Sequence, residues 1–196
     1  MTPQFVETIR VVDGVVQNLD LHQRRMDATM THFAPDAERL IINPSNIACG
    51  DGVWKARIVY TPETGHMTYE SAPYSLRPLH SLRMLTADDI DYKYKSTDRR
   101  HLQLFHDACT DADDALIVRH GLVTDTTYAN VAIWDGTRWL TPSEPLLRGT
   151  RRAALLRDGK IFESEIPASS LTPTTPIMVF NAMIEPGQII VDHVLF

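Results

Sequence analysis

Short β-prone runs separated by X-Gly pairs are the feature that most constrains how this chain folds. Asp13-Gly14, His120-Gly121 and Asp135-Gly136 each stand between runs rich in valine, isoleucine or leucine. Such pairs are typical of the tight turns that join antiparallel strands. Only two or three helical segments accompany these strands. The pattern therefore predicts an α+β fold rather than an alternating, doubly wound parallel sheet.

The predicted elements form two groups on either side of a stretch with two prolines, Ser71 to Pro78. The first group is a hairpin from Phe5, a helix over Leu21–Phe33 with Asp20 as its N-cap, and strands at Val53–Tyr60 and Met67–Glu70. The second group holds a strand at Asp91–Lys95, a helix over Thr97–Cys109, several short strands, and a helix from Thr150 to about Leu156. We expect a small N-terminal domain over residues 1–76 and a larger domain over residues 77–196.

Composition places the chain among globular proteins and excludes several function classes. Of 196 residues, 43% are hydrophobic and 22% are charged, which argues against disorder. Nineteen basic and 25 acidic residues give a net charge of −6, so nucleic acid and anionic membrane surfaces are unexpected partners. The two cysteines, Cys49 and Cys109, are too few for a disulfide framework, and a reducing cytoplasm is the simplest location. The histidines are dispersed, and no metal is expected.

Two lysines, Lys93 and Lys95, stand near the end of a predicted strand, and two residues apart they share one of its faces. A lysine walled by apolar neighbours loses solvation, its pKa falls, and it can form a Schiff base with an aldehyde. Taken alone, the same residues also fit a solvated lysine at a strand end.

Further motifs follow at informative spacing. In chain order they are His22-Gln23-Arg24-Arg25-Met26, the lysine segment, the turn Gly121 to Asn130, Thr141-Pro142, Leu146 to Arg151, and Phe180-Asn181-Ala182-Met183. In this order they resemble the class IV aminotransferases, the fold-type IV enzymes that use pyridoxal 5′-phosphate. That family includes branched-chain and D-amino-acid aminotransferases and 4-amino-4-deoxychorismate lyase. The resemblance implies a small N-terminal α+β domain and a barrel-like C-terminal α+β domain.

The resemblance implies a role for each matching residue near the cofactor. Lys95, rather than Lys93, is the catalytic Schiff-base lysine, because Arg99 stands four residues later, where the family has arginine or tyrosine. Asp125 occupies the position of the family's glutamate and would face the pyridine nitrogen, although its sequence also suits a plain turn. Asn130 closes the same turn.

The phosphate and the substrate have their own implied partners. Gly149 and Thr150 open a helix, whose N-terminal N–H groups bind anions. Arg24 and Arg25 lie about 100° apart round the helix, so both cannot point at one phosphate. The family match selects Arg25 for the charged contact, although the two arginines also fit a solvated pair. Arg99, Asn181 and Ala182 match segments on the substrate side.

The implied function is amino transfer between an amino acid and a 2-oxo acid. Two alternatives stay open: pyruvate elimination from 4-amino-4-deoxychorismate, giving 4-aminobenzoate, and a non-catalytic relic of the fold. The chain is shorter than usual for the family, and Gly149-Thr150 replaces a longer Gly-Ile-Thr motif. The resemblance further implies a small amino-acid-like substrate and a homodimer.

Overall fold

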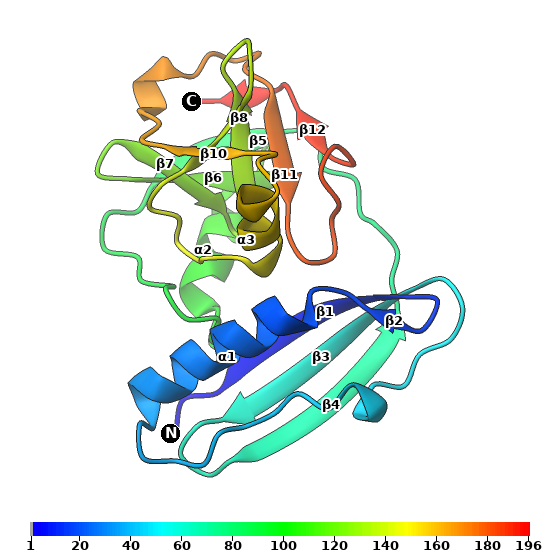
Figure 1. Ribbon diagram of the computed structural model, residues 1–196. Coiled ribbons are helices and arrows are strands. Elements are labelled where there is room, and N and C mark those ends of the chain that lie inside the picture. The colour runs from blue at the N-terminus through cyan, green and yellow to red at the C-terminus, as the bar shows by residue number, and fades with distance from the viewer. Residues whose placement is uncertain (1) are drawn as a thin grey trace. The chain divides into compact units, whose positions relative to one another are not determined.

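The computed structural model describes residues 2–196. They form two compact units: the first extends to Leu76 and also takes Tyr94–Asp98, and the second comprises Arg77–Lys93 and Arg99–Phe196. Sheets dominate both units, with few helices (Figure 1). The predicted α+β class is confirmed. Residues 94–98, which we expected in the second domain, pack with the first unit instead.

The first unit is built on an antiparallel sheet with the strand order β2-β1-β3-β4. Its strands are β1 (Phe5–Val12), β2 (Val15–Val16), β3 (Val53–Thr61) and β4 (His66–Pro73). The hairpin at Asp13-Gly14 is confirmed, since φ values of 47° and 82° are the left-handed pair of a type I′ turn. The edge strand β4 extends beyond the predicted Met67–Glu70 and ends at Pro73, where a missing N–H costs little.

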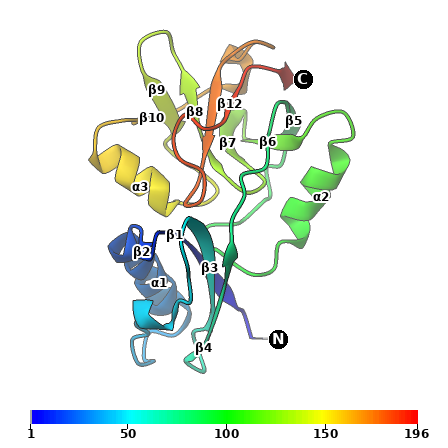
Figure 2. The same cartoon turned by 90° about the vertical axis from the view of Figure 1, so that its right-hand side faces the viewer.

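Helix α1 (Leu19–Phe33) lies along this sheet (Figure 1 and Figure 2). Its apolar face packs Met26 and Met30 into the cluster that contains Ile9 of β1 and Ile58 of β3. The predicted N-cap was wrong. The cap is Asn18, in the left-handed region at φ 50°, where asparagine is one of the few tolerated residues. Asp20 lies in the first turn, where its charge favours the helix dipole.

The predicted strand at Asp91–Lys95 is absent. The backbone of residues 94–98 instead borders the open edge of β1, with an isolated bridge between Phe5 and Ser96. Val6 N–H donates to the Lys95 carbonyl at 2.9 Å, and Thr97 N–H donates to the Gln4 carbonyl at 2.9 Å. Strand β2 pairs the same edge of β1 at Val11–Val12 alone, which leaves the end near Phe5 open to this segment. Only an isolated bridge forms there, so the segment borders the sheet without joining it as a strand.

A larger sheet forms the second unit, with strand order β10-β9-β8-β7-β6-β5-β13 and β11 joined to both β8 and β12. Its strands are β5 (Leu82–Thr86), β6 (Asp114–Arg119), β7 (Leu122–Thr126), β8 (Asn130–Trp134), β9 (Trp139–Pro142), β10 (Phe162–Ser164), β11 (Ile177–Phe180), β12 (Ile190–Val191) and β13 (Val194–Leu195). Most neighbours are antiparallel; β5 runs parallel to both β6 and β13, and β10 runs parallel to β9.

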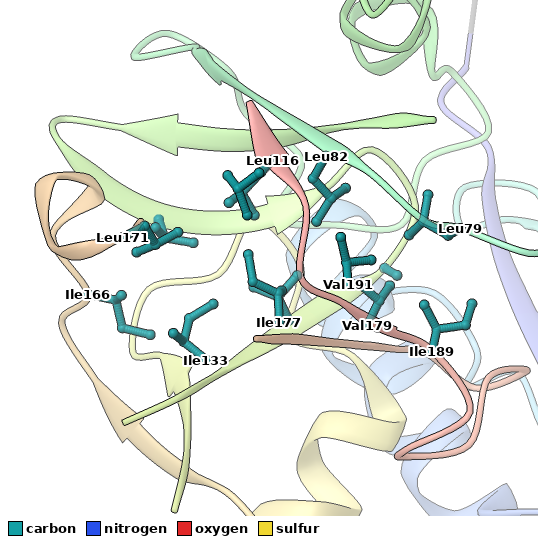
Figure 3. Packing of buried hydrophobic residues seen from close by; sticks show 14 of the residues in the cluster. Leu79, Leu82, Leu116, Ile133, Ile166, Leu171, Ile177, Val179, Ile189 and Val191 are labelled. Atoms are coloured by element: carbon teal, nitrogen blue, oxygen red, sulfur yellow. The ribbon is translucent and has the colours of Figure 1, made fainter. Parts of the chain in front are cut away.

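Strands from distant positions in this order share one hydrophobic core. Leu82 of β5 and Val194 of β13 belong to the same buried cluster as Ile133 of β8 and Ile177 of β11. Figure 3 shows Leu82, Ile133 and Ile177 turned toward a common interior. A flat sheet could not bring these side chains together, so the sheet curls around its core. This curvature agrees with the barrel-like domain that the family resemblance implied.

Two helices complete the second unit: α2 (Arg100–Ala108) and α3 (Thr150–Arg157). Helix α2 begins later than the predicted Thr97, because Thr97 is bonded to the first unit. Short 3-10 turns lie at Pro44–Asn46 and Ala168–Ser170. Within residues 2–196, no helix combines the length and apolar character that crossing a bilayer requires.

Candidate active site

A buried cluster of charged side chains lies between β1 and α1 in the first unit. Arg25 donates from Nε to Glu7 Oε1 at 2.9 Å and from Nη2 to Glu7 Oε2 at 2.5 Å. His22 Nδ1 lies 2.6 Å from Glu7 Oε2, and because a carboxylate can only accept, Nδ1 carries the proton. Glu7 and His22 are almost completely buried, while 14% of the Arg25 side chain remains exposed.

Electrostatics fix the charge states of this cluster. Burial alone would raise the pKa of Glu7, but the charge of Arg25 and the hydrogen bonds from His22 and Arg25 lower it to about 2. Burial lowers the pKa of His22, and the charges of Arg25 and Lys95 add to this effect against the hydrogen bond to Glu7. The cluster at neutral pH therefore holds a carboxylate, a guanidinium and a neutral imidazole.

Lys95 is in the same unit as this cluster. Its side chain is half-buried, and its charge acts on His22. Lys93, the competing candidate, is exposed and belongs to the second unit. The two arginines also separate: Arg24 is 75% exposed and lies 3.8 Å from Asp20 on the outer face of α1. The structure thus brings Lys95 and Arg25 into one unit and leaves Lys93 and Arg24 in solvent.

In the second unit, Asp125 is held at the end of β7 by two neutral donors. Asn130 Nδ2 donates to Asp125 Oδ1 at 2.9 Å, and Leu147 N–H donates to Asp125 Oδ2 at 2.9 Å. The Asn130 amide also donates to the Leu147 carbonyl at 2.8 Å, which ties the loop before α3 to the start of β8. Asp125 is only 4% exposed. Its burial raises the pKa of its carboxyl to about 6, although both hydrogen bonds oppose the rise.

Gly149 caps α3 directly beside this network. A glycine at the cap position has no side chain to accept from the first N–H groups of the helix. A Cβ atom at position 149 would lie 2.0 Å from Asn130 Oδ1. The φ of Gly149 is −68°, a value open to any residue, so the requirement for glycine comes from the close approach of Asn130 and not from the backbone.

Replacing Gly149 with alanine is therefore expected to lower the free energy of unfolding by about 1–3 kcal/mol, the usual cost of overpacking. Urea unfolding followed by circular dichroism measures the change. In an Asn130→Ala background the cost should shrink, because the amide that collides with the new methyl group is gone. An equal cost in both backgrounds would show that Asn130 is not the obstacle.

The predicted substrate-side residues converge on the turn between β7 and β8. Arg99 Nη2 donates to the Thr127 carbonyl at 2.8 Å, and Asn181 Nδ2 donates to the Tyr128 carbonyl at 3.3 Å. Asn181 Oδ1 accepts from the N–H groups of Met183 and Ile184 and so shapes the turn that contains Ala182. The segment from Asp125 to Asn130 is thus bonded to three other parts of the second unit: the N-cap of α2, the loop before α3 and the turn after β11.

Sequence reasoning missed Glu7. The sequence does contain a signal that Glu7 is buried. The alternation of β1 places Glu7 on the same face as Phe5, Ile9 and Val11, which all belong to the apolar core. A lone carboxylate on an apolar strand face requires a buried partner. The other omission, the backbone N–H of Leu147, has no sequence signal.

The residues fit pyridoxal phosphate. Asp125 is a buried carboxylate whose hydrogen-bond donors are neutral, and although the charge of Arg152 acts on it, burial still raises its pKa; a protonated ring nitrogen is a cation that such a group would stabilise. Arg25 in the first unit and the start of α3 in the second are each, taken separately, suitable donors for a phosphate. Members of the class IV aminotransferase family use this cofactor.

Comparison with known proteins agrees with this fit. The family model described as amino-transferase class IV matches residues 4–189. An uncharacterised protein of Haemophilus influenzae is 30% identical over 188 residues, which cover 93% of this chain and 98% of that protein.

Two solved structures are similar along nearly their whole length. A "putative 4-amino-4-deoxychorismate lyase" from Haemophilus somnus superposes with a TM-score of 0.83 at 28% identity, covering 94% of this chain and 98% of that one. A "putative amino-acid aminotransferase" from Mesorhizobium loti gives a TM-score of 0.77 at 21% identity, covering 98% and 100%. These matches, and above all the family model spanning most of the sequence, show that the chain belongs to the class IV aminotransferase family.

Proposed function

We propose that this chain is a pyridoxal-phosphate-dependent enzyme that transfers an amino group between an amino acid and a 2-oxo acid. The observation that carries the proposal is the environment of Asp125: a buried carboxylate with neutral donors on both oxygens and a pKa raised to about 6. A carboxylate in this state is stabilised by a nearby cation, and it stabilises the protonated form of a ring nitrogen in return.

In this proposal each residue has one task. When bound, the cofactor supplies a ring that stabilises negative charge on the substrate carbon bearing the amino group. Lys95 would hold the cofactor through its amine and, once the substrate's amine has taken its place on the aldehyde, would be the free base that moves a proton to and from that carbon. Arg25 and the N–H groups of Gly149 and Thr150 bind the phosphate. Asn130 holds Asp125 in place.

Arg99 and Asn181, with the backbone of Ala182, are assigned to the substrate. Arg99 and Asn181 are anchored to adjacent carbonyls, those of Thr127 and Tyr128, and a guanidinium so placed is suited to a carboxylate. The substrate we infer is a small amino-acid-like molecule. The homodimer that the family resemblance implies is tested separately by sedimentation velocity.

A lyase reaction is the second candidate, and one observation favours it. The solved structure at 28% identity is named as a putative 4-amino-4-deoxychorismate lyase, and the aminotransferase-named structure is less similar in sequence. Elimination of pyruvate from that substrate would use the same lysine as base and the same ring as electron sink.

The test is a substrate panel with the purified chain and added pyridoxal phosphate. Absorbance first establishes whether the cofactor binds, and borohydride treatment establishes whether it is bound to a lysine. D- and L-amino acids with 2-oxo acid acceptors, and aminodeoxychorismate, are then supplied in turn. Exchange of amino groups supports transferase activity, while 4-aminobenzoate and pyruvate support the lyase. A chain that binds no cofactor refutes both.

Replacing Arg25 with alanine is expected to weaken pyridoxal-phosphate binding by about 1.5–3 kcal/mol, the usual value of a charge-assisted hydrogen bond. Because Glu7 would then be buried without its cationic partner, the free energy of unfolding should also fall, by about 3–5 kcal/mol. Fluorescence titration and urea unfolding measure the two effects. Arg24→Ala is the matched control on the exposed face and should equal the wild type in both. The reverse pattern would show that the wrong helix face was chosen.

A further inference from the structure

The position of Glu7 is unfavourable for stability alone. Its carboxylate is completely buried on the α1 face of β1, within a layer formed by Phe5, Ile9 and Val11. Desolvating an ion pair costs about as much as the pair returns, and an apolar side chain in its place is often at least as stable. An ion pair at this position therefore calls for an explanation beyond folding.

The geometry of the pair determines the orientation of Arg25. The two oxygens of Glu7 accept from Nε and Nη2, one edge of the planar guanidinium, and this bidentate contact fixes both its plane and its direction. A guanidinium has five N–H donors, of which Glu7 takes two. The Arg25 side chain keeps 14% of its surface exposed, whereas Glu7 is completely buried, so the arginine is the member of the pair that a ligand could reach.

His22 holds the carboxylate from a second direction. Its Nδ1–H donates to Glu7 Oε2, the oxygen that also accepts from Arg25 Nη2. His22 and Arg25 are three residues apart on α1, so they project from the same side of the helix. The carboxylate is thus held from two directions, and this restrains the guanidinium of Arg25 that it contacts.

We infer that Glu7 is a positioning residue for the phosphate of the cofactor, acting through Arg25. The inference rests on the proposed function, in which Arg25 contacts that phosphate. Glu7 itself touches no ligand: it fixes the guanidinium beforehand, so that binding a phosphate costs little conformational entropy. A consequence is that Glu7 should affect only ligands that carry the phosphate.

The experiment compares pyridoxal 5′-phosphate with pyridoxal, which has the same aldehyde and ring but no phosphate. Dissociation constants are measured by absorbance titration, and the signal of Lys95→Ala under the same conditions is subtracted to remove adducts on other lysines. Wild type should prefer the phosphorylated aldehyde. Glu7→Gln should lose about tenfold of that preference, equivalent to about 1.4 kcal/mol, with pyridoxal binding unchanged.

Two further variants test whether the loss of preference is specific to the contact between Glu7 and Arg25. Glu7→Asp keeps the negative charge that pairs with Arg25, so this variant can be measured if Glu7→Gln fails to fold. Aspartate is one methylene too short for the bidentate contact, so the variant should lose the preference as well. Glu70→Gln is the matched control in the same sheet, since Glu70 is 72% exposed and lies 3.8 Å from Arg57. It should retain the wild-type preference.

The outcomes separate the two proposals. If wild type prefers the phosphorylated aldehyde and the Glu7 variants keep that preference, the inference is overturned while the proposed function stands. An equal loss of affinity for both aldehydes would make Glu7 a purely structural residue and also overturn the inference. If wild type forms no adduct at Lys95 with either aldehyde, the proposed function fails, and the role of Glu7 fails with it.

Discussion

Lys95→Ala is expected to abolish the covalent attachment of pyridoxal phosphate and to reduce turnover to background. Alanine has no amine, so no bond to the cofactor's aldehyde can form and no proton carrier stands beside the substrate carbon. Borohydride reduction followed by peptide mass mapping gives a direct readout, because reduction fixes the cofactor to the lysine that held it. The wild-type adduct should lie on the peptide that contains Lys95.

Lys93→Ala is the matched control, two residues away in the same segment. Lys93 is exposed and is grouped with the second unit, whereas Lys95 is half-buried and belongs to the unit of Arg25. The Lys93 variant should therefore keep the adduct and most of its turnover. A cofactor adduct mapped to Lys93 in the wild type would refute the assignment.

Asp125→Asn is expected to lower turnover by about 100-fold or more while the cofactor stays bound. The amide keeps the shape of the side chain but removes the charge that stabilises a protonated ring nitrogen, and each pKa unit lost there is about a tenfold change in the protonated fraction. Binding should persist through Lys95, Arg25 and the start of α3. Steady-state kinetics and a separate cofactor titration distinguish the two effects.

The hydrogen bonds of Asp125 add a smaller cost to this variant. Both carboxylate oxygens accept, from Asn130 and from Leu147, so an amide nitrogen at position 125 would face one of these donors. The free energy of unfolding should fall by about 1–3 kcal/mol for the unsatisfied pair. Asp125→Glu is the control, since it retains the charge and restores the residue usual in the family. If the asparagine variant turned over near the wild-type rate with cofactor bound, Asp125 would be only a turn residue.

Local patterns accounted for much of the fold. The Asp13-Gly14 turn and the helix carrying Arg25 follow from residue chemistry within a few positions. Where a predicted element was wrong, the observed structure depended on a partner that is distant in the sequence. Residues 91–95 were predicted to form a strand, but only the segment from Tyr94 borders β1, eighty or more residues earlier, and it forms an isolated bridge and no ladder.

The candidate site was predictable to the same degree. Motif order selected Lys95 and Asp125, and their chemical roles stay predictions. The order of motifs along the sequence does not give the distances between residues in the folded protein. Glu7 reaches Arg25 from another element, and the N–H of Leu147 reaches Asp125 from a loop 22 residues on. The requirement for glycine at position 149 likewise depends on Asn130, which no dihedral preference reveals.

The attachment of Tyr94–Asp98 to the first unit also bears on how the protein can be made. During synthesis, the edge of β1 beside Phe5 stays uncovered until this segment leaves the ribosome, and β5 of the other unit is made before it. The ring cluster of Phe5, Phe33 and Tyr94 is likewise incomplete until then. The two units are therefore completed in an interleaved order. Cutting the chain at a single peptide bond after Leu76 would remove Lys95 from the unit in which it packs.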